Sequence, residues 1–240
     1  FYERALGQSL MGKVANSQQG HSGPAGYHLA LFALAFWPGS LLAARAVPFA
    51  WRMRAQPAVR FLLCWIIPTW IIFELVATKL PHYVLPTYPA IACLAAAALY
   101  DPNPAQSGRW GRIVLVAVSV LWLGVSAVLA SAGPIALWQI EGVASSIAIT
   151  LGVLGFVAAC AALVLLWRAR KGAAIAALVL ASVLVLGNTF GYAAPRLDRM
   201  WMSPRIEAAV RSARSCEAGL LVTTPYHEPS LVFLHGRTST

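Results

Sequence analysis

The stretch Lys79-Leu80-Pro81-His82-Tyr83-Val84-Leu85-Pro86 is a short polar segment between two long apolar runs, residues 61–78 and 84–100. Each run is long enough to cross the hydrocarbon core of a bilayer as a helix. Pro81 and Pro86 fix φ and remove two backbone donors, which stiffens the segment between the runs. The sequence therefore predicts two membrane helices joined by a rigid polar turn.

The rest of the chain also has the composition of a membrane protein. Of its 240 residues, 59% are hydrophobic and 11% are charged, whereas about a quarter of the residues in soluble domains are charged. The apolar residues are gathered into runs that predict an all-α polytopic membrane protein with about six transmembrane helices. The predicted spans are residues 27–44, 61–78, 84–100, 113–132, 146–167 and 173–190.

The two ends of the chain are more polar than its middle. Residues 1–25 predict an external amphipathic or loop segment, because their apolar residues have helical spacing within a polar context. Residues 26–190 predict the transmembrane domain, and residues 191–240 return to a soluble composition. The chain begins with Phe1 and ends within this last segment. We interpret it as a piece of a longer protein that lacks the N-terminal part.

The C-terminal segment has a pattern of its own. Ser203-Pro204 predicts an N-cap followed by proline at the first helical position, and a helix over residues 204–214. Residues 220–223 predict a short buried strand, and Leu231 to Leu234 form another apolar run. A helix followed by a strand predicts the start of a small external α/β domain.

Basic residues are distributed unevenly among the loops. The chain has 18 Lys and Arg against eight Asp and Glu, a net charge of +10. The loops after the first, third and fifth predicted spans hold nine basic residues: Arg45, Arg52, Arg54, Arg60, Arg109, Arg112, Arg168, Arg170 and Lys171. The alternate loops hold one, Lys79. Because basic loops stay in the cytoplasm, this bias predicts that residues 1–25, the Lys79–Tyr83 turn and residues 191–240 share the external face.

The same distribution excludes one class of partner. Basic residues at the ends of apolar runs indicate membrane orientation and contact with lipid phosphate. The sequence has no aromatic-and-basic repeats, metal knuckles or long basic arm, so we exclude nucleic acid. Three of the four cysteines lie in apolar runs as small hydrophobes, and Cys216 lies in the polar tail, so no disulfide framework is predicted.

Two interpretations of the central turn follow from its residues. Lys79, His82 and Tyr83 place a cation, an imidazole and a phenol within five residues. Lys and Tyr favour membrane interfaces wherever they occur, so the turn is either a plain interfacial turn or a site for an anionic lipid headgroup. Glu74 is costly inside an apolar span unless it is paired, and we expect Lys79 to be its partner. We expect His28 to be an interfacial side chain.

Two segments of the chain resemble the aminoarabinose transferase family. The first combines Phe1-Tyr2-Glu3 and Lys13 with His21-x-x-Pro24-x-x-Tyr27, and it leads into a span that contains Trp37-Pro38. The second is Lys79-Leu80-Pro81-His82-Tyr83-Val84-Leu85-Pro86-x-Tyr88-Pro89. Their order and spacing, together with an external tail, extend the resemblance over essentially the whole chain. The family consists of integral-membrane glycosyltransferases of the GT-C class, related to the protein O-mannosyltransferases.

The resemblance implies transfer of a sugar, with inversion, from a polyprenyl (undecaprenyl) phosphate carrier to a lipid A-like, glycan or protein acceptor. The transfer would take place at the periplasmic face of a bacterial inner membrane. The resemblance places Lys13 near the carrier phosphate and Tyr83 in contact with it, with Lys79 and His82 as adjacent candidates. It places His21 where the family has a histidine that helps to bind a divalent metal ion, zinc. The catalytic acidic residue of the family lies in an earlier external loop, so none is expected in this chain.

Two other function classes remain open at this point. The first is a transporter or flippase for a polyprenyl-linked lipid, although the predicted spans lack the buried ionisable chains and paired broken helices that alternating access uses. The second is a non-catalytic membrane scaffold with an external interaction domain. The sequence does not exclude a scaffold, because the catalytic carboxylate is not in this chain. Acidic residues in an earlier external loop of the longer protein would favour the enzyme.

Overall fold

The computed structural model describes residues 23–102, 108–213 and 228–235. Within these ranges all the secondary-structure elements are helices, which confirms the predicted helical class. Five helices are long and apolar enough to cross a membrane, and they are Pro57–Leu75, Pro81–Leu99, Arg109–Glu141, Ser146–Trp167 and Lys171–Arg196. The described part of the chain is therefore a multi-pass helical membrane protein with five such helices, one fewer than the sequence predicted.

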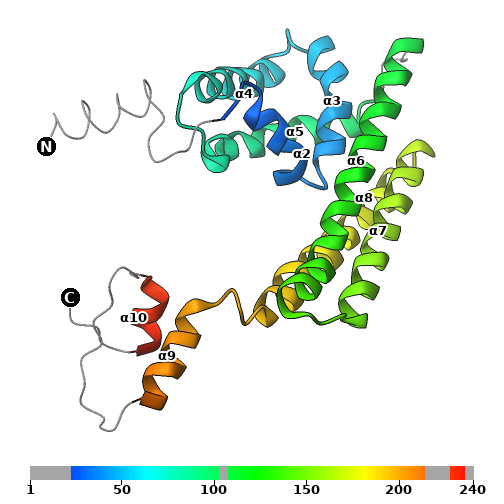
Figure 1. Ribbon diagram of the computed structural model, residues 1–240. Coiled ribbons are helices and arrows are strands. Elements are labelled where there is room, and N and C mark those ends of the chain that lie inside the picture. The colour runs from blue at the N-terminus through cyan, green and yellow to red at the C-terminus, as the bar shows by residue number, and fades with distance from the viewer. Residues whose placement is uncertain (1–22, 103–107, 214–227, 236–240) are drawn as a thin grey trace, which may run out of the picture.

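The helices form two groups, and a separate C-terminal pair follows them (Figure 1). The first group comprises α2 (Tyr27–Ala35), α3 (Ser40–Arg52), α4 (Pro57–Leu75), the 3₁₀ helix η2 (Pro81–Thr87) and α5 (Tyr88–Leu99). The second group comprises α6 (Arg109–Ala136), the π-helical turn η3 (Leu137–Glu141), α7 (Ser146–Trp167), α8 (Lys171–Leu186), the π-helical η4 (Gly187–Ala193) and η5 (Ala194–Arg196). In Figure 1, α4 and α5 run across the direction of α6, α7 and α8.

The first predicted span, residues 27–44, is not a single helix. The chain breaks between α2 and α3, where the Trp37–Pro38 peptide bond is cis. Pro38 has no backbone N–H to continue the hydrogen-bond ladder of α2. The indole Nε1 of Trp37 donates to Ser126 Oγ at 2.9 Å, and its ring stacks on Trp122 with centroids 6.4 Å apart. These contacts hold the break against α6, so residues 27–44 belong to two helices instead of the one continuous span that the sequence predicted.

The predicted external α/β domain is not supported by the described residues. α9 (Met202–Ala213) matches the helix predicted over residues 204–214, and α10 (Pro229–His235) covers the last apolar run. Pro229 begins α10, at the helix position where a missing N–H is least costly. No strand forms in residues 202–213 or 228–235, and the strand predicted over residues 220–223 lies outside the described ranges. In Figure 1, α9 and α10 pack on each other away from the other helices.

Small residues bring α6, α7 and α8 into close contact. A Cβ added to Gly152 of α7 would lie 2.4 Å from the Ala130 carbonyl oxygen in α6. A Cβ added to Gly155 would lie 2.6 Å from Val185 Cγ2 in α8. The contact continues through buried alanines, namely Ala158, Ala159, Ala162, Ala174 and Ala181. Van der Waals contact between small residues is a main source of helix association in membranes, so these glycines hold the second group together.

We expect Gly152→Val to destabilise the protein by about 1–3 kcal/mol, because the new side chain overlaps the Ala130 carbonyl and α6 and α7 must separate. The matched control is Gly124→Val on α6, where an added Cβ meets no atom within 4 Å. Thermal unfolding of both variants in the same detergent measures the difference. Equal stability of the two variants would contradict the packing described here.

Candidate functional site

Glu74, near the end of α4, joins three parts of the first group. The backbone N–H groups of Gly26 and His28 donate to its two carboxylate oxygens at 3.2 and 2.9 Å. Lys79 Nζ lies 3.3 Å from Oε2 of the same carboxylate and also donates to the Glu74 backbone carbonyl. A carboxylate at a helix N-terminus satisfies free backbone donors and complements the helix dipole. Glu74 therefore caps α2 from another helix and pairs with the central turn.

His28 is buried within the protein, beneath this turn. It is 1% exposed, and its Nε2 lies 3.2 Å from the Leu80 carbonyl oxygen. A carbonyl only accepts hydrogen bonds, so Nε2 carries the hydrogen in this contact. His28 Nδ1 lies 3.5 Å from Glu74 Oε1. The sequence did not indicate this burial, which arises because the chain after Glu74 folds back over the first turn of α2.

The segment before α2 also covers Lys79. A Cβ added to Gly23 would lie 3.1 Å from Lys79 Cδ and 2.9 Å from Tyr27 Cδ2, so only a glycine fits there without displacing a neighbour. Lys79 is 7% exposed as a result. Two segments carry the family resemblance, and they are more than 50 positions apart in the sequence. Their described residues are therefore in direct contact in the structure.

The other half of the turn is open to the outside. The Tyr83 N–H donates to the Leu80 carbonyl at 3.1 Å in the first turn of η2. Its ring is half-buried, with its centroid 5.0 Å from that of Phe73 on α4. The His82 ring is exposed and packs edge-on against Tyr83 at 5.1 Å. The turn thus has a buried cation on one side and an accessible imidazole and phenol on the other.

The structure places three of the five predicted site residues. Lys79, His82 and Tyr83 lie on one turn, while Lys13 and His21 lie outside the described residues. The predicted pair of Glu74 with Lys79 is confirmed. The sequence analysis missed the capping of α2 by Glu74, because no local pattern indicates a hydrogen bond between residues 46 positions apart.

The described residues do not form a zinc site on their own. They include no group of three or more His, Cys, Asp and Glu side chains arranged to hold a metal ion. At the turn, His28 and Glu74 offer two metal-ligating side chains, whereas zinc sites in proteins use three or four protein ligands. His21 is outside the described ranges, so the predicted metal contact stays a prediction and no chemical step is derived from it.

We expect Glu74→Gln to lower stability by about 2 kcal/mol, because it leaves a buried ammonium without its carboxylate. Lys79→Gln should also destabilise the protein, while the double variant should lose less than the sum of the two. A double-mutant cycle on thermal unfolding measures this coupling. Additive effects would show that the two side chains do not interact.

The comparisons with known proteins point to one family. No family model and no solved structure matches the chain. It is similar to the undecaprenyl phosphate-alpha-4-amino-4-deoxy-L-arabinose arabinosyl transferase of Pseudomonas paraeruginosa, with 37% identity over 87 residues, which is 36% of this chain and 16% of that protein. The second transferase of this name from Proteus mirabilis is 31% identical over 111 residues, 46% of this chain and 20% of that protein.

A third relative, the transferase of the same name from Serratia proteamaculans, is 29% identical over 124 residues, 47% of this chain and 22% of that protein. The aligned part thus spans 16–22% of the length of these three curated relatives. Over that part the chain is similar to the aminoarabinose transferases, in agreement with the family resemblance predicted from the sequence. The matches cover 36–47% of this chain, whereas the predicted resemblance extended over essentially the whole chain.

Proposed function

We propose that the chain belongs to a membrane glycosyltransferase that takes a sugar from an undecaprenyl phosphate carrier. The observation that carries this proposal is the contact of the two family-like segments at Gly23 and Lys79, which the bonds of Glu74 to His28 and Lys79 support. The names of the relatives specify an arabinosyl transferase and an undecaprenyl phosphate-linked aminoarabinose. The membrane-spanning helices supply the setting that such a lipid carrier requires.

The turn has the chemistry to hold the phosphate of the carrier. Sugar transfer releases a lipid phosphate, so donors at its oxygens stabilise the charge that develops on the leaving group. The Tyr83 hydroxyl and the exposed His82 ring provide such donors at the surface of the turn. The Lys79 ammonium has three N–H donors, and Glu74 takes two of them. Because Lys79 is 7% exposed, the third reaches a phosphate oxygen when the segment before α2 moves aside, while Glu74 keeps the ammonium in place.

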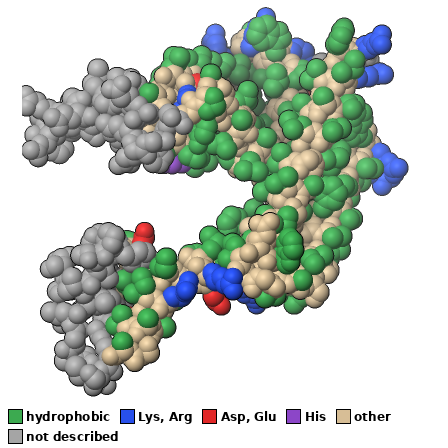
Figure 2. All heavy atoms as spheres, in the orientation of Figure 1, with side chains coloured by type: hydrophobic (Ala, Val, Ile, Leu, Met, Phe, Trp, Pro, Cys, Tyr) green, Lys and Arg blue, Asp and Glu red, His purple; other side chains and the backbone are tan. Residues whose placement is uncertain are grey.

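We place this turn at the periplasmic face of the bacterial inner membrane. The proposal is supported by the nine-to-one distribution of basic residues between alternate loops. Figure 2 shows several Lys and Arg side chains along the upper edge of both helix groups. A lipid A-like molecule, a glycan or a protein would approach as acceptor from the periplasm. The proposal keeps Lys13 as a further phosphate contact.

The proposal also keeps His21 as a ligand of a zinc ion near the site. Metal analysis of the purified full-length protein, compared with His21→Ala, tests this part on its own. Stoichiometric zinc that is lost in the variant supports it, and wild-type protein without zinc removes it.

A lipid transporter is the second candidate function. The helix is interrupted between α2 and α3, and broken membrane helices are a feature of transporters, although the Glu74 carboxylate binds the opposite end of α2. Release of the sugar from the carrier in an assay with purified protein identifies the transferase. Movement of an intact carrier across vesicles without sugar release identifies the transporter.

In the full-length enzyme, we expect Lys79→Ala to lower sugar transfer about a hundredfold, because it removes a charged donor from the leaving phosphate. Tyr83→Phe should lower it at least about tenfold through loss of one hydrogen bond to a charged group. Tyr100→Phe, at the other end of α5, is the matched control and should transfer sugar at the wild-type rate. Wild-type transfer by both turn variants would refute this phosphate site.

The proposed orientation predicts which residues reach the periplasm. In a protein whose four native cysteines are replaced, we expect a cysteine at His82 to react with a membrane-impermeant maleimide in intact cells. A cysteine at Arg54 should react only after the cells are opened, because its loop is predicted to be cytoplasmic. Both native side chains are exposed in the structure, so access within the protein does not limit either reaction. The reverse labelling pattern would place the turn in the cytoplasm.

A further inference from the structure

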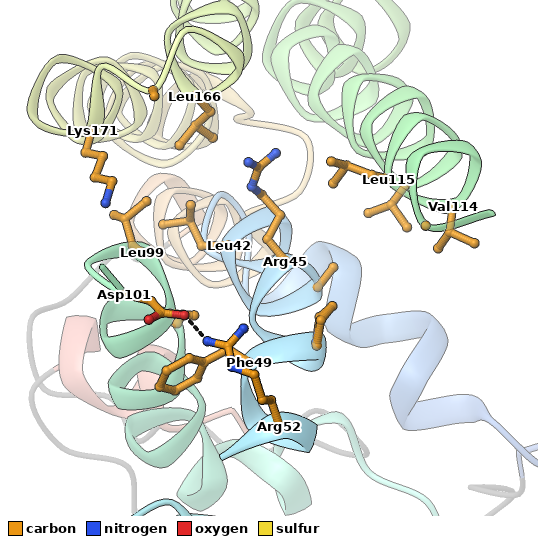
Figure 3. A pocket seen from close by; sticks show the side chains of 17 residues that line it. Leu42, Arg45, Phe49, Arg52, Leu99, Asp101, Val114, Leu115, Leu166 and Lys171 are labelled. Atoms are coloured by element: carbon orange, nitrogen blue, oxygen red, sulfur yellow. Dashed lines mark hydrogen bonds and ion pairs between the residues drawn. The ribbon is translucent and has the colours of Figure 1, made fainter. Parts of the chain in front are cut away.

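A second candidate binding region lies at the other end of α5 from the Lys79 turn. It is a cavity of about 440 Å³ whose walls come from α3, α5, α6 and the connection between α7 and α8. The turn precedes α5, whereas Asp101 at the cavity follows the last residue of α5. The cavity therefore lies where the two helix groups meet (Figure 3). No residue of the Lys79 turn lines it, so it is separate from the proposed carrier site.

The cavity carries an excess of positive charge. Arg45, Arg52 and Lys171 line it together with one carboxylate, Asp101. Arg52 forms an ion pair with Asp101, and its guanidinium lies 5.9 Å from the centre of the Phe49 ring. The charges of Arg52 and Asp101 cancel, so the lining keeps two positive charges, those of Arg45 and Lys171.

Arg45 is placed to receive an anion. Its Nη1 is covered by the protein and has no hydrogen-bond partner within the described residues. Burial lowers the pKa of Arg45 from its ordinary value, but a guanidinium stays charged in proteins. A covered charged donor without a partner is unfavourable, and an anionic oxygen in the cavity would satisfy it. Figure 3 shows Arg45 on α3 with Leu115 and Leu166 around the same space and Lys171 at its edge.

The remaining walls are hydrocarbon. Leu42, Leu99, Leu115, Val118 and Leu166 line the cavity beside the charged groups. A free inorganic phosphate would satisfy the cations but would leave these side chains without contacts. A molecule with both a phosphate and an acyl chain fits both parts of the lining. Basic pockets between membrane helices are suited to the headgroups of anionic lipids for this reason.

We propose that this cavity binds one anionic phospholipid, with its phosphate at Arg45 and Lys171 and the start of an acyl chain against the leucines. The bound lipid would fill the junction between the two helix groups and support their contact. This role does not depend on the sugar-transfer reaction, and it assigns a binding function to basic residues that otherwise serve only orientation.

Native mass spectrometry of the full-length protein with phosphatidylglycerol or phosphatidylcholine tests the proposal. We expect one phosphatidylglycerol to be retained by the wild-type protein and by Arg60→Gln, a control whose exposed side chain lies outside the cavity lining. Arg45→Gln and Lys171→Gln should each weaken retention about fivefold, the contribution of one basic residue near a lipid surface. Arg45→Lys should retain most of the binding, which shows that the fold is intact.

Three results would overturn the proposal. The first is equal retention of phosphatidylglycerol by Arg45→Gln, Lys171→Gln and Arg60→Gln. The second is displacement of phosphatidylglycerol by millimolar inorganic phosphate, together with unchanged retention in Ala98→Phe, a substitution that fills the apolar part of the cavity. That pattern identifies a site for free phosphate. The third is a photoreactive residue at position 98 that cross-links to another segment of the full-length protein instead of to lipid.

Discussion

The carboxylate of Glu74 is the contact on which the first helix group depends. It receives the N-terminal N–H groups of α2, it pairs with Lys79, and it lies beside the buried His28. A single charge near the end of α4 therefore holds α2 against the turn that leads into α5. Inside a membrane protein such a charge is tolerated only when donors surround it. The donors come from two segments that are far apart in the sequence. Because Glu74 needs donors from both, it brings the two segments together.

This arrangement changes how the central turn functions. The sequence predicted that Lys79 pairs with Glu74, and the family resemblance made Lys79 a candidate contact of the carrier phosphate. In the structure the ammonium is covered and held by Glu74, while His82 and Tyr83 form the accessible part of the turn. Glu74 fixes the Lys79 ammonium on the same turn that carries the phenol and the imidazole. Pre-organised charge of this kind favours a developing anion without rearrangement during the reaction.

Sequence reasoning predicted the helical membrane class, the pairing of Glu74 with Lys79 and the helix at α9, because each follows from local pattern or from charge in an apolar run. It failed where a distant contact decides the outcome. The break between α2 and α3 is held by the bond of Trp37 to Ser126 of α6, and the burial of His28 arises from the chain after Glu74. The apolar run at Leu231–Leu234 was too short to determine its secondary structure by periodicity, and α10 forms there.

The central claim is that the turn joined to Glu74 receives the carrier phosphate. The most direct test is photo-cross-linking of the full-length protein in membranes with a polyprenyl phosphate that carries a photoreactive group next to its phosphate. Mass spectrometry of the labelled peptides then locates the headgroup. Cross-links within residues 79–89 and in the segment that leads into α2 are the predicted result. Cross-links concentrated at the Arg45 cavity, or absent from the turn while the carrier is bound, would contradict the account.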